Sequence, residues 1–241
     1  QPLEAASCLE RGGLIHQAIE IYVEEMEYES AARLYAQIDQ HDTARDFWSR
    51  AIDKACQQKR FIDAARIAQV ELHDDEFTLS LLATGWTSQS KEARNCLAEW
   101  IELSGSLGNH DAVSRRIESL KALRTHADRA EMAAHVLGQV AHRYPDDTVK
   151  SQAKDAARVI ASAQLMRLNS NRNSRLWLDR LSELEPDDQL LQRDCDRYHD
   201  QLIAPRQERK TATIPARSDR KRSLIPVSTW NVPNDQRIVK A

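Results

Sequence analysis

The chain is poor in the two residues that interrupt helices. All six glycines, but only three of the seven prolines, lie before residue 203 of the 241-residue chain. Aromatic residues make up 5% of the sequence, and no apolar run approaches the roughly 18 residues that a membrane-spanning helix needs. So few breakers predict a nearly all-helical body over positions 1–202, and the missing apolar run predicts no membrane partner.

The sequence patterns of common catalytic sites are also missing. The chain has no GxSxG nucleophile motif, no GxxxxGK[ST] phosphate loop and no GxGxxG dinucleotide motif. Its four cysteines are scattered without the spacing of metal ligands, and this usage fits a reducing compartment better than a disulfide framework. We therefore expect a cytoplasmic protein that is not an enzyme and has no cofactor or metal.

The N-terminal part of the chain contains a repeated alanine phrase. AIEIY begins at Ala18, AARLY at Ala31 and ARDFW at Ala44, in equal steps of 13, and AARIA follows at Ala64 after a longer step. Each phrase has a small residue followed by a bulky one three or four positions later, which is helical spacing. A unit of this length predicts a helix of roughly nine residues plus a tight turn, stacked on its neighbours rather than folded around one central pocket.

Turn and charge patterns place the other helices. The segments 144–147 and 185–188 each contain Pro-Asp-Asp, in which Pro ends one helix and Asp caps the next. Three further aspartates, and Asp187 of the second segment, precede apolar-periodic runs and are expected to cap helices; the three are Asp42, Asp74 and Asp111. The predicted helices are 3–11, 14–25, 28–37, 41–57, 60–72, 75–84, 90–104, 110–123, 127–143, 147–167, 173–184 and 188–202.

The stretch from Gly13 to Tyr22 (GLIHQAIEIY) resembles the turn and second helix of a tetratricopeptide repeat. In that family a Gly ends the first helix, an Ala five residues later allows close packing, and a bulky aromatic follows at the next turn. Residues 26–35 repeat the phrase without the Gly, and the resemblance is best over about residues 4–70. The step of 13 differs from the family's period of about 34. The resemblance implies an all-α fold, an irregular tetratricopeptide-like α-solenoid of antiparallel helices.

The chain divides into three parts by repeat pattern and composition. We expect regular repeats in residues 1–86, an irregular helical continuation in 87–202, and a basic linker with a short β-hairpin-like tail in 203–241. The tail has nine Lys or Arg and three Asp or Glu, a net charge of +6 against −9 for the residues before it. Residues 224–230 and 236–240 read as two short strands, which need further β structure to be stable. This layout resembles, more weakly, the passage into the propeller of bacterial MoxR–vWA–β-propeller ternary-system proteins, and it implies that another domain follows.

Two features of the tail are candidate partner-binding sites. Trp230 follows the linker without helical context, so it can anchor in a partner or begin the core of a β-domain. A basic run can contact phosphates, but it lacks interleaved aromatics, which favours a solvated linker over nucleic-acid binding. The residues of this run are Arg217, Arg220, Lys221 and Arg222.

Other chemically suggestive residues have structural explanations. The cluster 73–76 (HDDE) reads as a helix N-terminus with acids that complement the helix dipole. His135 and His142 share a helix face but lie two turns apart, about 10 Å, which is too far for one metal ion. Two sets are expected in the helical core: Cys8, Cys56 and Cys96, and Trp48, Trp86, Trp100 and Trp177.

These patterns favour a non-catalytic scaffold that binds protein partners on the surface of stacked helices. The acidic body favours a basic or mixed-charge partner. Two alternatives remain open: a regulatory helical part of an enzyme or ATPase assembly, including one of bacterial defence, and nucleic-acid binding through the basic tail. Further domains of the same polypeptide are also candidate partners.

Overall fold

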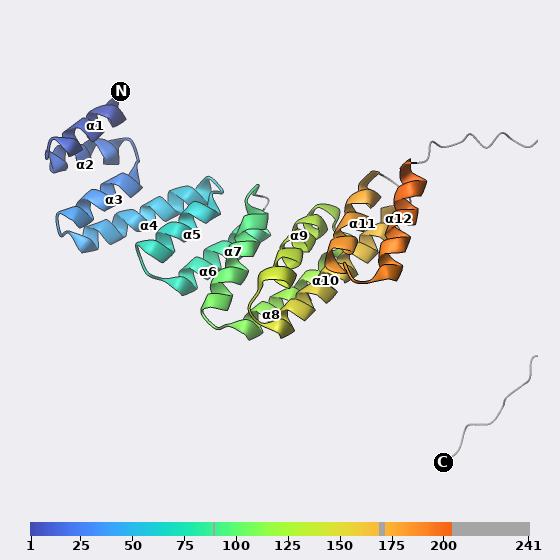
Figure 1. Cartoon of the computed structure of the whole chain (residues 1–241). Coiled ribbons are helices and arrows are strands. Elements are labelled where there is room, and N and C mark those ends of the chain that lie inside the picture. Colours follow the sequence, from blue (N-terminus) through green and yellow to red (C-terminus); the bar gives the residue numbers. More distant parts are fainter. Residues whose placement is uncertain (89, 169–171, 204–241) are drawn as a thin grey trace, which may run out of the picture. The chain divides into compact units, whose positions relative to one another are not determined.

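The computed structural model describes residues 1–88, 90–168 and 172–203, and within these ranges the chain is all-helical and contains no strand (Figure 1). All the predicted helices are present, and α3, α4 and α9 match at both ends. The elements are α1 (Pro2–Arg11), α2 (Ile15–Glu24), α3 (Tyr28–Gln37), α4 (His41–Gln57), α5 (Phe61–Val70), α6 (Asp75–Thr87), α7 (Ala93–Ser106), α8 (His110–Leu120), the 3-10 helix η1 (Lys121–Thr125), α9 (Ala127–Arg143), α10 (Asp147–Leu168), α11 (Arg172–Leu184) and α12 (Gln189–Ile203). None of these helices has the length and apolar character required to span a bilayer. The predicted linker after Ile203 and the predicted strands lie outside the described residues.

The 13-residue spacing of the sequence is one helix plus one turn. Helices α1, α2 and α3 have ten residues each, and α1 to α4 begin at residues 2, 15, 28 and 41. In each turn one residue is left-handed, with φ of 78° at Gly13, 58° at Met26 and 59° at Asp39. The N–H of the next residue bonds to the carbonyl five positions earlier, at 2.9 Å from Leu14 to Leu9 in the first turn. This is the bond of a Schellman motif, and it satisfies a carbonyl that the helix end would leave unpaired.

The repeated alanine is the fourth residue of its helix. Ala18, Ala31, Ala44 and Ala64 hold this position in α2 to α5, and each is at most 3% exposed. A methyl group at this point lets neighbouring helices approach closely. The interval from Ala44 to Ala64 is longer because α4 has 17 residues where α3 has ten.

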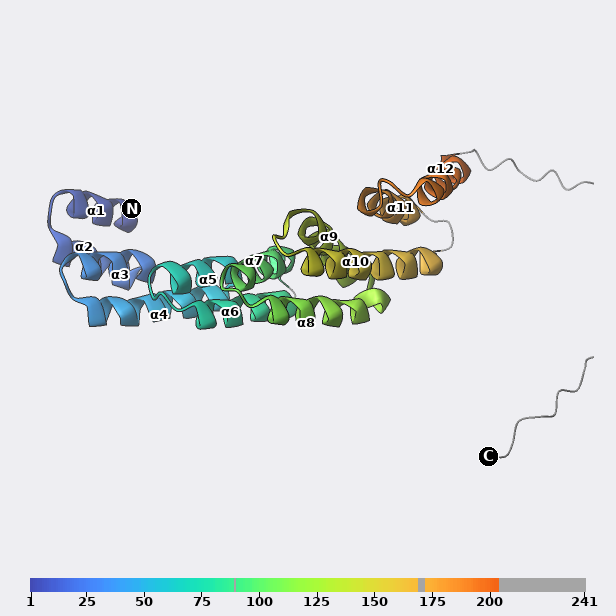
Figure 2. The same ribbon diagram turned by 60° about the horizontal axis from the view of Figure 1, so that its bottom comes forward.

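The helices stack in two layers. Figure 2 shows α3, α5 and α7 in one row and α4, α6 and α8 in the other. Successive helices contact each other, and α5 also contacts α7, α7 contacts α9, and α9 contacts α11. Helices α3, α5, α7 and α9 begin at residues 28, 61, 93 and 127, so a new helix pair begins about every 33 residues. From α5 to α11 the odd-numbered helices are therefore joined by direct contacts.

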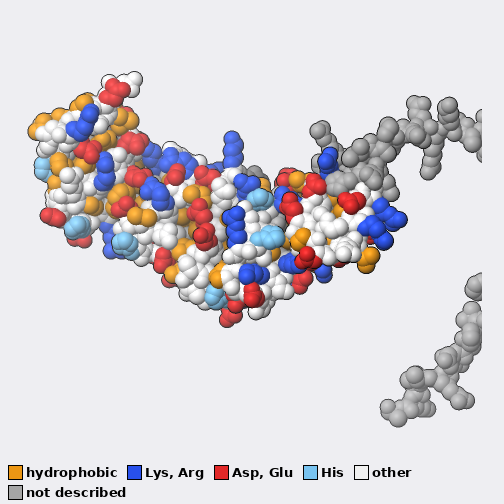
Figure 3. Space-filling model, in the orientation of Figure 1, with side chains coloured by type: hydrophobic (Ala, Val, Ile, Leu, Met, Phe, Trp, Pro, Cys, Tyr) orange, Lys and Arg blue, Asp and Glu red, His pale blue; other side chains and the backbone are white. Residues whose placement is uncertain are grey.

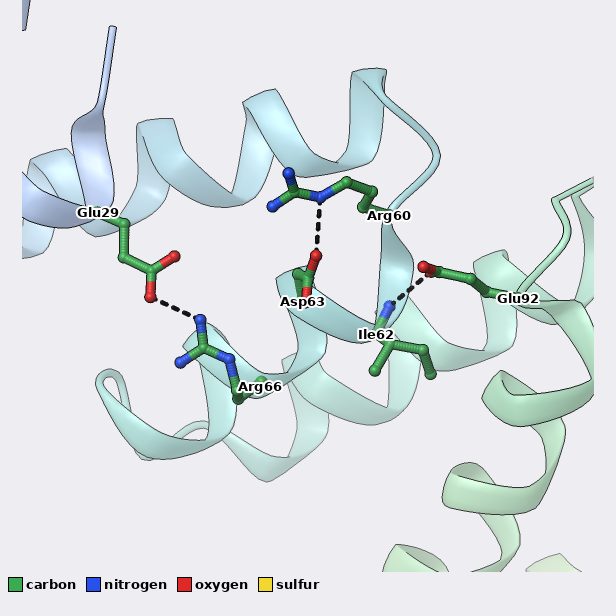
Figure 4. A network of polar contacts seen from close by, with 6 residues as sticks. All are labelled: Glu29, Arg60, Ile62, Asp63, Arg66 and Glu92. Atoms are coloured by element: carbon green, nitrogen blue, oxygen red, sulfur yellow. Dashed lines mark hydrogen bonds and ion pairs between the residues drawn. The ribbon is translucent and has the colours of Figure 1, made fainter. Parts of the chain in front are cut away.

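Polar links join the odd-numbered helices near their ends (Figure 4). Nη2 of Arg66 in α5 lies 2.6 Å from Oε1 of Glu29 in α3. Glu92, the residue before α7, accepts a hydrogen bond from the backbone N–H of Ile62 at 3.3 Å. Ile62 is in the first turn of α5, where the N–H groups have no partner within the helix. Side chains of α3 and of the start of α7 thus hold α5 from both sides.

A longer link connects α9 to the end of α6. The guanidinium of Arg129 donates to the carbonyls of Trp86, Thr87 and Ser88 at 2.6, 2.8 and 3.0 Å. It also stands over the indole of Trp86, 5.1 Å from the ring centroid. These carbonyls belong to a helix C-terminus, so a cation that binds them also complements the helix dipole.

The predicted helix caps are confirmed at Asp74 and in the segment 144–147, where Asp146 Oδ1 accepts the backbone N–H of Val149 at 2.8 Å. Asp74 Oδ1 accepts a backbone N–H of the first turn of α6 at 2.8 Å. The predictions for Asp42 and Asp111 were wrong, because α4 and α8 begin at the residue before each aspartate. These carboxylates therefore lie inside the first turn of the helix. The prediction for Asp187 was wrong by one residue, since Asp188 accepts two backbone N–H bonds at 3.0 Å. The division of the helical body at residue 86 stays a prediction.

Candidate functional site

Three hollows join into one groove along α5, α7, α9 and α11. The first, of about 550 Å³, lies among α5, α6 and α7; the second, of about 420 Å³, lies between α7 and α9; the third, of about 340 Å³, lies among α9, α10 and α11. Glu102 and Ser106 line both the first and the second hollow, and Gln139 and Arg143 line both the second and the third. Because neighbouring hollows share lining residues, they adjoin one another in a single row, called the groove from here on.

Small residues keep the groove open, while tyrosine fills one side of it. Gly138 of α9 and Ala161 of α10 line the third hollow, and a Cβ built on Gly138 would meet no atom within 4 Å. At Gly105 of α7 a Cβ would lie 2.6 Å from the hydroxyl oxygen of Tyr144, so glycine is required for that ring to fit. The Tyr144 hydroxyl lies 3.0 Å from Nδ1 of His110, which fixes the ring at the edge of the second hollow.

The first hollow carries two carboxylates one helical turn apart. Glu99 and Glu102 of α7 line it and are exposed to solvent, and neither has an ion pair with another described residue. Partial burial in the groove wall raises the pKa of Glu99, and the negative charges of Glu102 and Glu92 raise it further. The cation in the same hollow, Arg66, is already paired with Glu29. This part of the groove therefore suits a cationic group of a ligand.

In the third hollow, unlike the first, positively charged side chains outnumber negatively charged ones. His135, His142 and Arg143 reach it from α9, and Arg180 and Glu183 reach it from α11. Burial lowers the pKa of His135, and the nearby guanidinium of Arg180 lowers it further. The two ends of the groove therefore differ in electrostatic character.

Arg180 is the most enclosed cation of the third hollow, with its side chain 18% exposed. Its Nη2 lies 3.7 Å from Oε1 of Glu131, which is an ion pair but too long for a hydrogen bond. Within the described part of the chain its buried Nε has no hydrogen-bond partner. The guanidinium packs 5.7 Å from the ring centroid of Trp177, and burial lowers its pKa. A buried donor without an acceptor is costly, which makes this side chain a candidate ligand-binding group.

A fourth hollow, of about 170 Å³ among α3, α4 and α5, has its charges already paired. Lys54 Nζ lies 3.2 Å from Oε1 of Glu27 and donates to the carbonyl of Met26 at 2.8 Å. This arrangement stabilises the turn between α2 and α3. Because the ammonium group of Lys54 is already bound, it is not available to a ligand.

Charges of both signs are interspersed over the face that Figure 3 shows, and hydrophobic side chains gather at the N-terminal end of this face. Leu3 of α1 and Leu14, just before α2, are among the exposed hydrophobic residues, at 43% and 50%. The acidic excess of the helical body is therefore not collected into a single patch on this face.

The partner-binding residues predicted from the sequence lie outside the described residues: Trp230, Arg217, Arg220, Lys221 and Arg222. The cluster 73–76 forms the start of α6, as expected, with Asp75 and Glu76 in its first turn. Among the described residues no group of three potential metal ligands comes together. His135 and His142 do share a helix face, and that face lines the third hollow.

The predicted core residues are confirmed in part. Trp48, Trp86 and Trp177 are buried, whereas Trp100 is half-buried beneath Arg116, whose guanidinium stands 4.6 Å from its ring centroid. Three cysteines were expected to be small core residues. Cys96 is fully buried, Cys56 is half-buried and Cys8 is exposed. Burial raises the pKa of the Cys96 thiol to about 12, so it is protonated and unreactive at neutral pH. The Cys8 prediction was wrong because, among the described helices, α1 packs against α2 and reaches α3 only through the ion pair of Glu10 with Arg33, which leaves the side of α1 that carries Cys8 open.

Sequence reasoning missed the residues that give the groove its character. Gly138 and Gly105 stand inside helices, where a glycine costs about 1 kcal/mol relative to alanine and so signals close packing or open space. This signal was present in the sequence and could have marked the groove. Nothing local marks Arg180 or Glu99, because their surroundings come from helices distant in the sequence.

Comparison of the chain with known protein families, with curated proteins and with solved structures finds no match. The helix stacking and the groove are therefore the basis for a functional assignment.

Proposed function

We propose that residues 1–203 form an irregular tetratricopeptide-like α-solenoid, and that the protein is a non-catalytic scaffold that binds an extended segment of a partner protein in the groove. The recurrence of helix pairs about every 33 residues supports this proposal, since the period of tetratricopeptide repeats is about 34. The contacts between successive odd-numbered helices support it too, because stacked repeats contact their neighbours in this way.

The continuity of the groove is the observation that carries the proposal. A pocket for a small molecule is a single concave site, whereas here three hollows share walls across four helices. An extended peptide places successive side chains about 3.3 Å apart along its length and so matches a run of adjoining hollows. Gln69 and Gln139 line the groove, and their amides can both donate to and accept from a peptide backbone.

The charges of the groove define the chemistry of the partner. Glu99 and Glu102 have no partner cation among the described residues, so the peptide presents a Lys or Arg to the first hollow. Complementary charges of this kind set the association rate and the register of the peptide more than its affinity.

No described residue supports the two alternative functions over the scaffold. No described residue distinguishes a regulatory arm of an enzyme or ATPase assembly from a scaffold, and nucleic-acid binding concerns the segment 206–222, which lies outside the described residues. The likeness in layout to MoxR–vWA–β-propeller proteins and the cytoplasmic location stay predictions.

Panning of a random peptide library against the full chain, followed by fluorescence anisotropy of labelled selected peptides, tests the proposed function. Reversing the groove acids, Glu99→Lys with Glu102→Lys, should weaken binding about tenfold or more at low salt, with less effect at high salt. Glu20→Lys with Glu24→Lys is the matched control, because these exposed glutamates of α2 line none of the hollows and change the net charge equally. Failure to select any peptide, or equal losses in both double variants, would contradict the proposal.

A further inference from the structure

We infer that the third hollow, among α9, α10 and α11, is a subsite for one acidic side chain, Asp or Glu, of the peptide held in the groove. The inference rests on the proposed function and adds a second anchor of opposite charge to the one at Glu99 and Glu102. It assigns Arg180 as the residue that binds the carboxylate.

Arg180 has the donors for such an interaction. Among the described residues its Nη2 is held only by the 3.7 Å ion pair with Glu131, and Trp177 supports its guanidinium from one side. A guanidinium binds a carboxylate with two parallel hydrogen bonds, which are stronger than bonds between neutral groups. A ligand carboxylate would therefore supply acceptors that the described part of the chain does not provide.

The local charge favours a monoanion. Arg94, Arg143 and Arg180 oppose Glu131 and Glu183 around this hollow, which leaves one net positive charge while the histidines are neutral. A carboxylate matches that charge, whereas a phosphate near neutral pH carries about −1.5 to −2 charges and would exceed it. His135 on the same wall adds positive charge when it binds a proton.

The hollow also has room for a side chain. Its volume is about 340 Å³, and Gly138, Ala157 and Ala161 contribute no bulk beyond a methyl group. A larger residue can replace Gly138 without a clash at Cβ. Its side chain would occupy the open space and exclude the peptide's acidic side chain from the hollow.

A double-mutant cycle between the protein and a selected, labelled peptide tests the inference. Replacing the peptide's Glu by Gln, or its Asp by Asn, should weaken binding to the wild-type chain by about tenfold or more, as the loss of a hydrogen-bonded ion pair does. The same replacement should cost less than threefold with Arg180→Gln, whereas Arg115→Gln, which removes an equal charge on α8, should leave the full tenfold loss. Equal losses in all three proteins would overturn the inference.

Gly138→Leu provides a variant that does not depend on the fold tolerating loss of Arg180. It should abolish the preference for the acidic residue while the Glu99 and Glu102 dependence remains. Selected peptides that show no acidic preference would refute the subsite and leave the proposed function standing.

A small probe covers the case in which panning selects nothing. N-acetylglutamate amide at millimolar concentration should shift the ring resonances of His135 in the full chain, and the N-acetylglutamine amide should not. Shifts that are the same for both probes, or that persist in Gly138→Leu, would also refute the subsite.

Discussion

Gly85 and Cys96 are so close that a Cβ built on Gly85 would lie 2.5 Å from the cysteine Sγ. The same Cβ would lie 2.7 Å from Cβ of Phe61. Helices α5, α6 and α7 therefore meet at residue 85, next to the first hollow, and the backbone of α6 approaches its neighbours to a distance that only glycine permits.

Substitution of this glycine should be costly. We expect Gly85→Ala to lower the free energy of unfolding by about 1–3 kcal/mol, because the buried neighbours must move to accept a methyl group. Gly138→Ala is the matched control: it stands in a helix with open space around its Cβ and should raise stability by up to about 1 kcal/mol. Urea denaturation followed by circular dichroism measures both, and a stable Gly85→Ala would show that the helices do not meet as described.

The three hydrogen bonds of Arg129 predict a second destabilised variant. Arg129→Ala should cost about 2–3 kcal/mol, because it leaves three carbonyls at the end of α6 without their charged donor. Arg129→Lys should recover less than half of this, since an ammonium group lacks the planar fork that reaches several carbonyls. Thermal unfolding gives the comparison, and equal melting temperatures for the Lys variant and the wild type would argue against the fork.

The lowered pKa of His135 predicts a pH dependence. Burial, Arg180 and Arg94 disfavour its protonated form in the folded chain, while Glu131 and Glu183 oppose this effect. The unfolded chain then binds the proton more readily, so the contribution of His135 to stability is complete above the ordinary pKa of 6.5 and is lost as the pH falls from there through the folded pKa.

The measurement is the difference between two proteins, which removes the titration of the other groups. Between about pH 7 and pH 5 the wild type should lose more stability than His135→Gln. Parallel losses would mean that His135 titrates alike in the folded and unfolded chains.

The sequence predicted the helices well because their signals are local. The alanine phrase reports burial at the fourth residue of a helix, and Pro145 and Pro186 mark where helices stop. The caps at Asp42 and Asp111 were predicted wrongly for a physical reason. The preceding turns close by backbone hydrogen bonds after a left-handed residue, so these helices begin without a side-chain cap.

The groove could not be predicted in the same way. Its walls come from contacts between every second helix, and such contacts leave no period in the sequence. The charge of Arg180 is informative only once α9 and α11 are known to lie side by side. The glycines inside α6, α7 and α9 were the available clue, since each marks either a close approach or an open space.

The Schellman turns make each of the first helices a separate structural unit. Each 13-residue unit is complete in its backbone hydrogen bonds, so removing one of the first three helices would leave the remaining turns intact and change only what packs on the N-terminal side of α4. The groove would keep its walls, because its lining residues begin at Ile62 of α5. Helix length follows a gentler rule: α4 exceeds α3 by seven residues, which is two turns and rotates the next unit by only about 20°. The N-terminal end of the array can therefore lose or gain whole 13-residue units, or two-turn extensions of a helix, while the groove stays intact.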